Sequence, residues 1–163
     1  MRNGDSEVSR LVDQLEREHG GEPWHGSSLV DILSGMSPEQ AAARPLAGAH
    51  TIWELVLHIT AWKGEVRRRL GGAPAGTPSE GDWPAPPSSS TAEAWRQALD
   101  ALEEADRALV DTIARLPDEQ LSELTNDRRV AEGSADTYFQ LVQGILQHDV
   151  YHSGQIALLK KAL

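Results

Sequence analysis

The segment from Ser134 to the C-terminus constrains the fold more than any other part of the chain. It contains no proline, and its apolar positions recur at alternating intervals of three and four residues. This spacing turns one side of a helix toward a core, whereas a half-buried strand would alternate at every second residue. We predict a long closing helix capped by Ser134, with a buried stripe formed by Tyr138, Leu141, Ile145, His148, His152, Gln155 or Ile156, and Leu159.

Two positions of that stripe hold histidine where the pattern calls for an apolar residue. His148 and His152 are four residues apart, which on a helix is about 6 Å along the axis and about 40° around it. Both imidazoles can therefore reach one metal ion, and Gln155 faces the same way. The spacing alone leaves a second interpretation open, because a histidine on an apolar stripe is often a core residue with an ordinary hydrogen-bond partner.

Three earlier segments have similar amphipathic spacing, and no part of the chain shows the pattern of a strand. With 163 residues the chain is large enough to bury one core, so we treat residues 1–163 as a single domain. The predicted fold class is all-α, a four-helix bundle. The expected helices cover residues 5–19, 51–70, 91–116 and 134–163, with short helical turns after Ser27 or Ser28, after Ser37 and over 117–120.

Residues 71–90 join the second and third long helices through a segment rich in proline and glycine. This segment has five prolines and four glycines and no periodicity. Such a long structureless connection is expected in a compact domain only where it crosses the fold or covers a site. Long crossovers in four-helix bundles join parallel neighbouring helices. We therefore predict an up-down-down-up bundle, with Trp83 holding the crossover in place.

A third histidine lies on the inward side of the second long helix. His58 follows Leu55 by three residues and precedes Trp62 by four, within the apolar stripe. Three imidazoles with one coordination position open form the usual ligand set of a catalytic zinc site. One divalent ion would also satisfy three imidazoles that are costly to bury without partners. We predict a metal site formed by His58, His148 and His152.

Composition excludes several other classes of function. The net charge is −10 and the chain has no basic stripe, so nucleic acid is not an expected partner. No apolar run is long enough to span a membrane and no signal-peptide pattern opens the chain, so we expect no membrane partner and a cytoplasmic location. Cysteine is absent, so any thiol used in a reaction must arrive with a substrate.

Four segments of the chain resemble the DinB family of metal-binding four-helix bundles. The most specific is HDVYHSGQI at 148–156, and the resemblance extends in order over nearly the whole chain. It implies an up-down-down-up bundle, often a homodimer, with a divalent metal ion held by His58, His148 and His152. The four segments are 24–26, 52–59, 82–84 and 148–156.

The resemblance also implies a class of reaction. Well-defined members of the family are S-transferases that use a low-molecular-weight thiol, such as bacillithiol or mycothiol, in some cases for detoxification. The expected partners are thus a small-molecule thiol and an electrophilic substrate, and the expected cofactor is a divalent ion, zinc or nickel. The chemistry agrees with this expectation, because a bound cation deprotonates a coordinating thiol at neutral pH.

Two other functions remain open. His148, Asp149 and His152 resemble a shortened H-E-x-x-H hydrolase motif, in which the acid acts on a water activated by the metal. Against this, Asp149 is about 100° around the helix from His148 and one methylene shorter than Glu, so a surface position or a hydrogen bond to a histidine is expected instead. In the remaining interpretation the metal has a structural or sensory role and no reaction occurs.

Four side chains are candidates for contacts around the metal without binding it. Gln155 is expected to hydrogen-bond one of the ligands or a metal-bound species, and Trp83 and Trp24 to line a pocket. Two positions are open for His25, either near the open end of the site or, as is more common for a histidine at the start of a helix, in a capping or exposed position. No residue is assigned a catalytic role. Gly144 and Gly154 indicate close approach of another helix, or room for the metal or for a partner subunit.

Overall fold

The structure is a computed structural model that describes residues 6–131 and 133–163. Within these residues it contains helices and no strand, apart from one isolated bridge between Leu124 and Thr137. The all-α prediction is confirmed. The elements are α1 (Glu7–Gly20), α2 (Leu29–Leu33), α3 (Pro38–Ala42), α4 (Ile52–Leu70), α5 (Ala92–Ile113), a 3₁₀ helix η1 (Asp118–Ser122) and α6 (Tyr138–Lys161).

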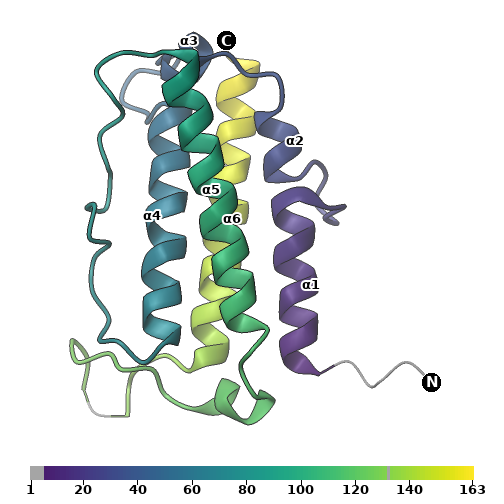
Figure 1. Cartoon of the computed structure of the whole chain (residues 1–163), viewed down its shortest axis with the longest axis vertical. Coiled ribbons are helices and arrows are strands. Elements are labelled where there is room, and N and C mark those ends of the chain that lie inside the picture. The colour runs from purple at the N-terminus through teal and green to yellow at the C-terminus, as the bar shows by residue number, and fades with distance from the viewer. Residues whose placement is uncertain (1–5, 132) are drawn as a thin grey trace.

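The four long helices form a bundle in which α4 and α5 run in the same direction. In Figure 1, α1 and α6 run upward and α4 and α5 run downward, so the segment between α4 and α5 returns along one side of the bundle. α4 packs against α5 and α6, and α1 packs against the same two helices, which places α1 and α4 at opposite corners. None of the helices in the described residues has the length and apolar character needed to cross a membrane.

Side-chain caps determine where the helices begin. At α4 the Thr51 backbone N–H donates to Glu54 at 2.7 Å, and the Glu54 N–H donates back to the Thr51 hydroxyl. The predicted cap of α6 is wrong, because Thr137 caps this helix and Ser134 does not. Gln140, three residues after Thr137, accepts from the Thr137 N–H and completes a capping box. The residue three positions after Ser134 is Thr137, whose side chain is too short to reach back to the Ser134 N–H and complete a capping box.

A polar layer divides the core of the bundle into two apolar clusters. One cluster contains the start of α4, the start of α5 and the end of α6, and the other contains the opposite ends of these helices together with most of α1. Each long helix has buried polar side chains at the level between them. The buried residues of this polar layer are Glu18, His19, His58, Lys63, Asp106, Asp149, His152 and Ser153.

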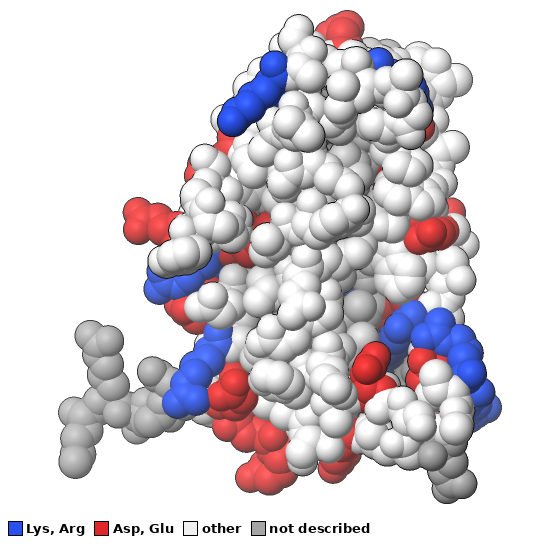
Figure 2. Space-filling model, turned by 180° about the vertical axis from the view of Figure 1, so that it is seen from behind, with Lys and Arg blue, Asp and Glu red and all other residues white. Residues whose placement is uncertain are grey.

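The side of the molecule opposite to the view of Figure 1 is largely uncharged at its centre. Figure 2 shows Lys, Arg, Asp and Glu side chains mainly along the edges of this side. α6 lies behind α5 in Figure 1 and therefore belongs to this side. Its only charged residues are Asp149, Lys160 and Lys161, and Asp149 is buried.

The buried Glu65 carboxylate holds the beginning of the crossover segment. It accepts from the Nε atoms of Arg68 and Arg69, each at 2.8 Å, and from the backbone N–H of Gly76 at 2.9 Å. The two arginines donate in turn to the carbonyls of Pro74 and Gly76. Burial alone would raise the pKa of Glu65, but these hydrogen bonds lower it to about 2.

Replacing Glu65 with glutamine is expected to lower the free energy of unfolding by about 2 kcal/mol at pH 7, because charge-assisted hydrogen bonds to a buried carboxylate are lost. A carboxyl whose folded-state pKa is depressed stabilises the protein above its ordinary pKa of 4.5 and loses this contribution as the pH falls toward 2. Urea unfolding at pH 7, 4 and 3 should therefore show a shrinking difference from the parent. Glu93→Gln, which alters an exposed pair with Arg96, is the control and should change little at any pH. A difference for Glu65→Gln that does not vary with pH would contradict this account.

Candidate metal centre

Three histidines meet between α4 and α6 in the polar layer. His58, His148 and His152, hereafter the histidine triad, have ring nitrogens within 4.8 Å of one another. Among the described residues this is the one group of three or more histidine or acidic side chains with metal-binding spacing. The Nε2 atoms of His58 and His148 are 3.0 Å apart. Zinc bound tetrahedrally at about 2.0–2.1 Å separates its nitrogen ligands by about 3.3 Å, so the triad is close to the required geometry.

Two of the rings are oriented by oxygen acceptors at Nδ1. The Nδ1–H of His58 donates to the backbone carbonyl of Asp82 at 2.5 Å, and the Nδ1–H of His152 donates to Oε1 of Gln155 at 2.7 Å. An acceptor at Nδ1 keeps the proton on that atom and leaves the Nε2 lone pair free, as in protein sites where histidine binds metal. Gln155 therefore hydrogen-bonds a histidine of the triad.

The third ring has a carboxylate beside Nδ1. Nδ1 of His148 lies 3.4 Å from Oδ1 of Asp149. With protons on Nδ1 of both His148 and His58, the two Nε2 atoms that face each other at 3.0 Å each present a lone pair. Two facing lone pairs repel unless a cation lies between them. The donor set therefore fits a divalent metal ion.

Burial keeps two rings of the triad in the form that binds metal. It lowers the pKa of His152 to about 4, and it lowers the pKa of His58 below the ordinary histidine value. Both rings are neutral at pH 7 for this reason. Neutral imidazole is the form that coordinates a cation, so these two residues need not lose a proton on binding.

The crossover segment covers the triad. Trp83 stacks on His58 with ring centroids 3.8 Å apart and on His50 with centroids 3.5 Å apart. Asp82 uses its side chain to accept from Nε1 of Trp62 at 2.8 Å, while its carbonyl holds His58. Residues 82–84 thus close one side of the histidine triad. The sequence contained no periodic signal that would have placed His50 beside Trp83.

Comparison with known proteins agrees with this architecture. A family model described as the DinB superfamily matches residues 24–156. The chain belongs to the DinB superfamily. No curated protein and no solved structure matches it significantly. The range matched by the DinB model includes the histidine triad, Gln155 and the crossover, and it begins after α1.

Several residues of this DinB chain lie away from the positions expected from the sequence. His25 and Trp24 are exposed in the loop before α2, and His25 makes no hydrogen bond or ring contact with the triad in the described part of the chain. Figure 1 shows this loop beside α1, on the other side of the bundle from the crossover. Among the described residues, no other helix approaches Gly144 or Gly154 closely, since a Cβ added at either position would meet nothing within 4 Å, and this part of the expectation is wrong.

A buried ion-pair network, absent from the sequence-based prediction, lies next to the DinB histidine triad. Lys63 of α4 is 1 % exposed, and its ammonium donates to Asp106 Oδ1 at 2.7 Å and to Asp149 Oδ2 at 2.5 Å. Burial alone would raise the pKa of the fully buried Asp149, but the Lys63 charge holds it below its ordinary value. The sequence feature that could have predicted burial of Lys63 is its position four residues after Ile59, on the inward stripe of α4.

Two cavities open at different levels of α6, one lined by His148 of the triad and the other by Gln155, which hydrogen-bonds His152. One of about 230 Å³ lies between α4 and α6 and is lined by Trp62, Arg69, Gly144 and His148, among others. The other, of about 310 Å³, adjoins Gln155 and is lined mainly by apolar side chains. Along α6 the first cavity extends toward the helix start from His148, and the second extends toward the helix end from Gln155.

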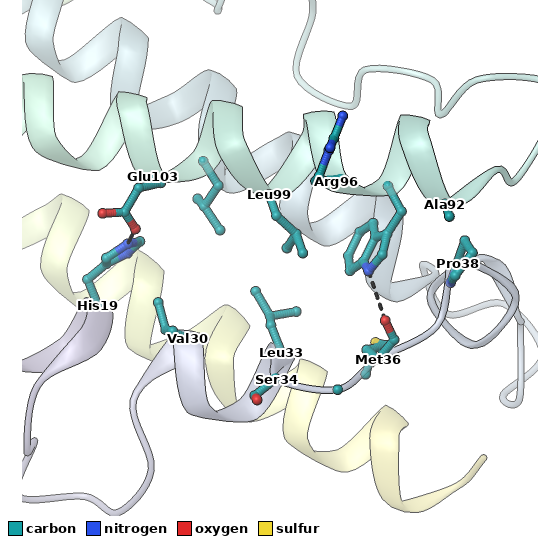
Figure 3. A pocket seen from close by; sticks show the side chains of 13 residues that line it. His19, Val30, Leu33, Ser34, Met36, Pro38, Ala92, Arg96, Leu99 and Glu103 are labelled. Carbon is teal, nitrogen blue, oxygen red and sulfur yellow. Dashed lines mark hydrogen bonds and ion pairs between the residues drawn. The ribbon is translucent and has the colours of Figure 1, made fainter.

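A further cavity of about 440 Å³ lies away from the DinB metal centre. Its lining includes residues of α2 and α5 and no histidine of the triad. Figure 3 shows His19 and Glu103 paired at one end of this cavity, with Nε2 of His19 3.0 Å from the carboxylate. Nδ1 of His19 lies 3.6 Å from Asp106, so this pair adjoins the far end of the Lys63 network.

Proposed function

We propose that this DinB-superfamily protein binds a divalent cation, zinc or nickel, through His58, His148 and His152, and transfers a low-molecular-weight thiol of the bacillithiol or mycothiol type to an electrophile. The observation that carries the proposal is the convergence of three histidine ring nitrogens within 4.8 Å of one another, with one cavity lined by His148 and a second lined by Gln155. A cation held by three imidazoles keeps a coordination position for a substrate.

The residues of the chain have separate tasks in this reaction. A bound divalent cation supplies one part of the chemistry, by favouring the thiolate form of a coordinated thiol at neutral pH. Because the chain has no cysteine, the thiol is a substrate. The Asp82 carbonyl and Gln155 hold the rings of His58 and His152 in the orientation that presents Nε2. Trp83 covers His58 and keeps water from that side.

The two cavities support a reaction with two substrates. The cavity beside His148 has polar groups at its far end, including Arg69 and Gln140, and suits the polar remainder of a thiol cosubstrate. The cavity beside Gln155 is lined by leucines, such as Leu55 and Leu158, and suits an apolar electrophile. Substrates bound on the two sides would meet at the triad.

The position of Asp149 favours transfer over hydrolysis. In the hydrolase alternative this carboxylate would act as a general base on a water at the open side of the metal. Asp149 is fully buried, with Oδ2 bound to the Lys63 ammonium at 2.5 Å and Oδ1 beside Nδ1 of His148, so it lies on the opposite edge of that ring from the metal-binding Nε2. The Asp82 carboxylate also lies beside the triad, but it is at Nδ1 of His58, 3.6 Å away and on the opposite edge of that ring from Nε2.

The proposal is tested with zinc- or nickel-loaded protein, bacillithiol or mycothiol, and monochlorobimane. The sulfur forms a bond to carbon as the carbon–chlorine bond breaks, chloride leaves with the electron pair, and the thiol proton passes to the solvent. Fluorescence of the conjugate should rise faster than without protein, and removal of the metal should return the rate to background. A protein that is inert with both thiols, but melts at a lower temperature after chelation, would have a structural metal instead.

Filling the cavity beside His148 should block this reaction without loss of stability. Gly144→Leu is expected to lower the conjugation rate about tenfold or more, since the new side chain enters the cavity. It should also raise the free energy of unfolding by up to about 1 kcal/mol, because glycine is a poor helix former. The matched control is Gly154→Leu, in the same helix and also in open space. Equal rates for the two variants would contradict this use of the cavity.

A further inference from the structure

The Lys63 ammonium joins two buried carboxylates, and these differ in their contact with the histidine triad. Asp106 is bound at 2.7 Å and Asp149 at 2.5 Å. The second oxygen of Asp149, Oδ1, lies 3.4 Å from Nδ1 of His148. The histidine next to Asp106 is His19, whose Nδ1 lies 3.6 Å from Asp106 Oδ1. His19 lines the cavity shown in Figure 3. Asp149 therefore faces the metal centre and Asp106 faces away from it.

The acceptor at His148 also differs in kind from the acceptors at the other two rings. His58 donates to a backbone carbonyl and His152 donates to an amide oxygen, both of which are neutral. His148 is the ring of the triad whose nearest oxygen at Nδ1 belongs to a carboxylate, since the Asp82 carboxylate at 3.6 Å from His58 Nδ1 is farther than the Asp82 carbonyl at 2.5 Å. A carboxylate acceptor orients an imidazole and makes the opposite nitrogen a stronger electron donor to a metal.

We propose that Asp149 is a positioning residue of the metal centre, which holds the His148 ring through Oδ1 while Lys63 immobilises its Oδ2. Like the proposed function, this role rests on metal binding by the triad. Lys63 is needed because a fully buried carboxylate without a partner would be costly to place in the core. Its bond to Oδ2 leaves Oδ1 as the oxygen that faces the histidine.

The two carboxylates provide a matched pair of variants. Asp149→Asn and Asp106→Asn each keep the size of the side chain, each remove one negative charge and each remove one carboxylate partner of Lys63. They differ in that only the first alters the acceptor of His148 among the contacts of the described residues. A comparison of the two separates positioning of His148 from a general effect of charge or of stability.

The zinc dissociation constant of each variant is measured by competition with a chromophoric chelator, and the unfolding of each metal-free protein is followed in urea. Asp149→Asn is expected to weaken zinc binding about 10- to 100-fold. Asp106→Asn should weaken it by less than about threefold for a similar loss of stability. Equal losses of affinity, or no loss in either variant, would overturn the positioning role. Absence of zinc binding by the parent would overturn the proposed function as well.

If Asp149→Asn does not fold, a measurement on the parent protein tests whether Asp149 holds the His148 ring. In nitrogen-15 spectra of the zinc-loaded protein, the His148 Nδ1–H should be shifted downfield and exchange slowly with water, as a hydrogen bond to a buried carboxylate requires. The Nδ1–H of His58, which donates to the Asp82 carbonyl, serves as the internal reference. A His148 Nδ1–H that exchanges rapidly while that of His58 does not would overturn the proposal.

Discussion

Replacing any one histidine of the triad with alanine is expected to abolish stoichiometric zinc binding at neutral pH. Each variant leaves two imidazoles, and the site loses one of three nitrogen ligands that now lie within 4.8 Å of one another. Two imidazoles fall short of the three protein ligands that an open zinc site uses. Elemental analysis after desalting, together with titration calorimetry of the metal-free variants, measures the stoichiometry and the affinity.

The control for these variants is His25→Ala. His25 is exposed in the loop before α2, so this change removes an imidazole without altering the triad. The variant should bind zinc as the parent does. Circular dichroism of all four proteins establishes that the helices are retained. If His58→Ala, His148→Ala and His152→Ala each bind zinc like the parent, the metal centre proposed between α4 and α6 does not exist.

The second large effect is expected from Lys63→Met, which should lower the free energy of unfolding by about 3–5 kcal/mol at pH 7. The change removes the ammonium that is 1 % exposed and leaves Asp106 and Asp149 buried without their cation. The carboxyls then have a folded-state pKa above the ordinary value, so their cost is present at pH 7 and falls as the pH drops. Urea unfolding of the metal-free protein at pH 7 and pH 5 measures both the loss and its sign.

Two further variants distinguish the ion pair from the loss of a long side chain. Lys161→Met changes an exposed lysine at the end of α6 and should alter the stability by less than about 0.5 kcal/mol. Addition of Asp106→Asn and Asp149→Asn to Lys63→Met should recover part of the loss, since no uncompensated charge remains in the core. A loss below about 1 kcal/mol for Lys63→Met would show that the network is not a buried ion pair in solution.

The helices and the triad could be predicted because both follow from the helical period. Thr51 and Glu54 define the start of α4 by a local capping pattern that the structure retains. His58 and His148 lie on inward stripes of two different helices, and neighbouring helices of a bundle bring such stripes together. The error at the start of α6 came from assigning the cap to Ser134 by residue type alone. Gln140, three positions after Thr137, completes a capping box and identifies Thr137 as the cap.

The remaining parts of the site depend on contacts that have no local signature. Lysine is rarely buried, so the inward position of Lys63 carried little weight until two carboxylates were seen to meet it. The stacking of His50 on Trp83 joins two loop residues whose separation is set by the path of the crossover. His25 illustrates the converse, since a loop without periodicity does not reveal toward which side of a bundle it turns.

The polar layer gives the bundle two hydrophobic cores that can change independently of each other. The clusters on either side of it have no buried member in common, and the layer between them contains the triad and the Lys63 network. A change of side-chain volume in one cluster can therefore be compensated by neighbours in the same cluster. A charged residue of the layer, in contrast, has its partners on other helices. Stabilising designs can repack either end of this protein freely, and successful changes of its chemistry will replace residues of the layer together.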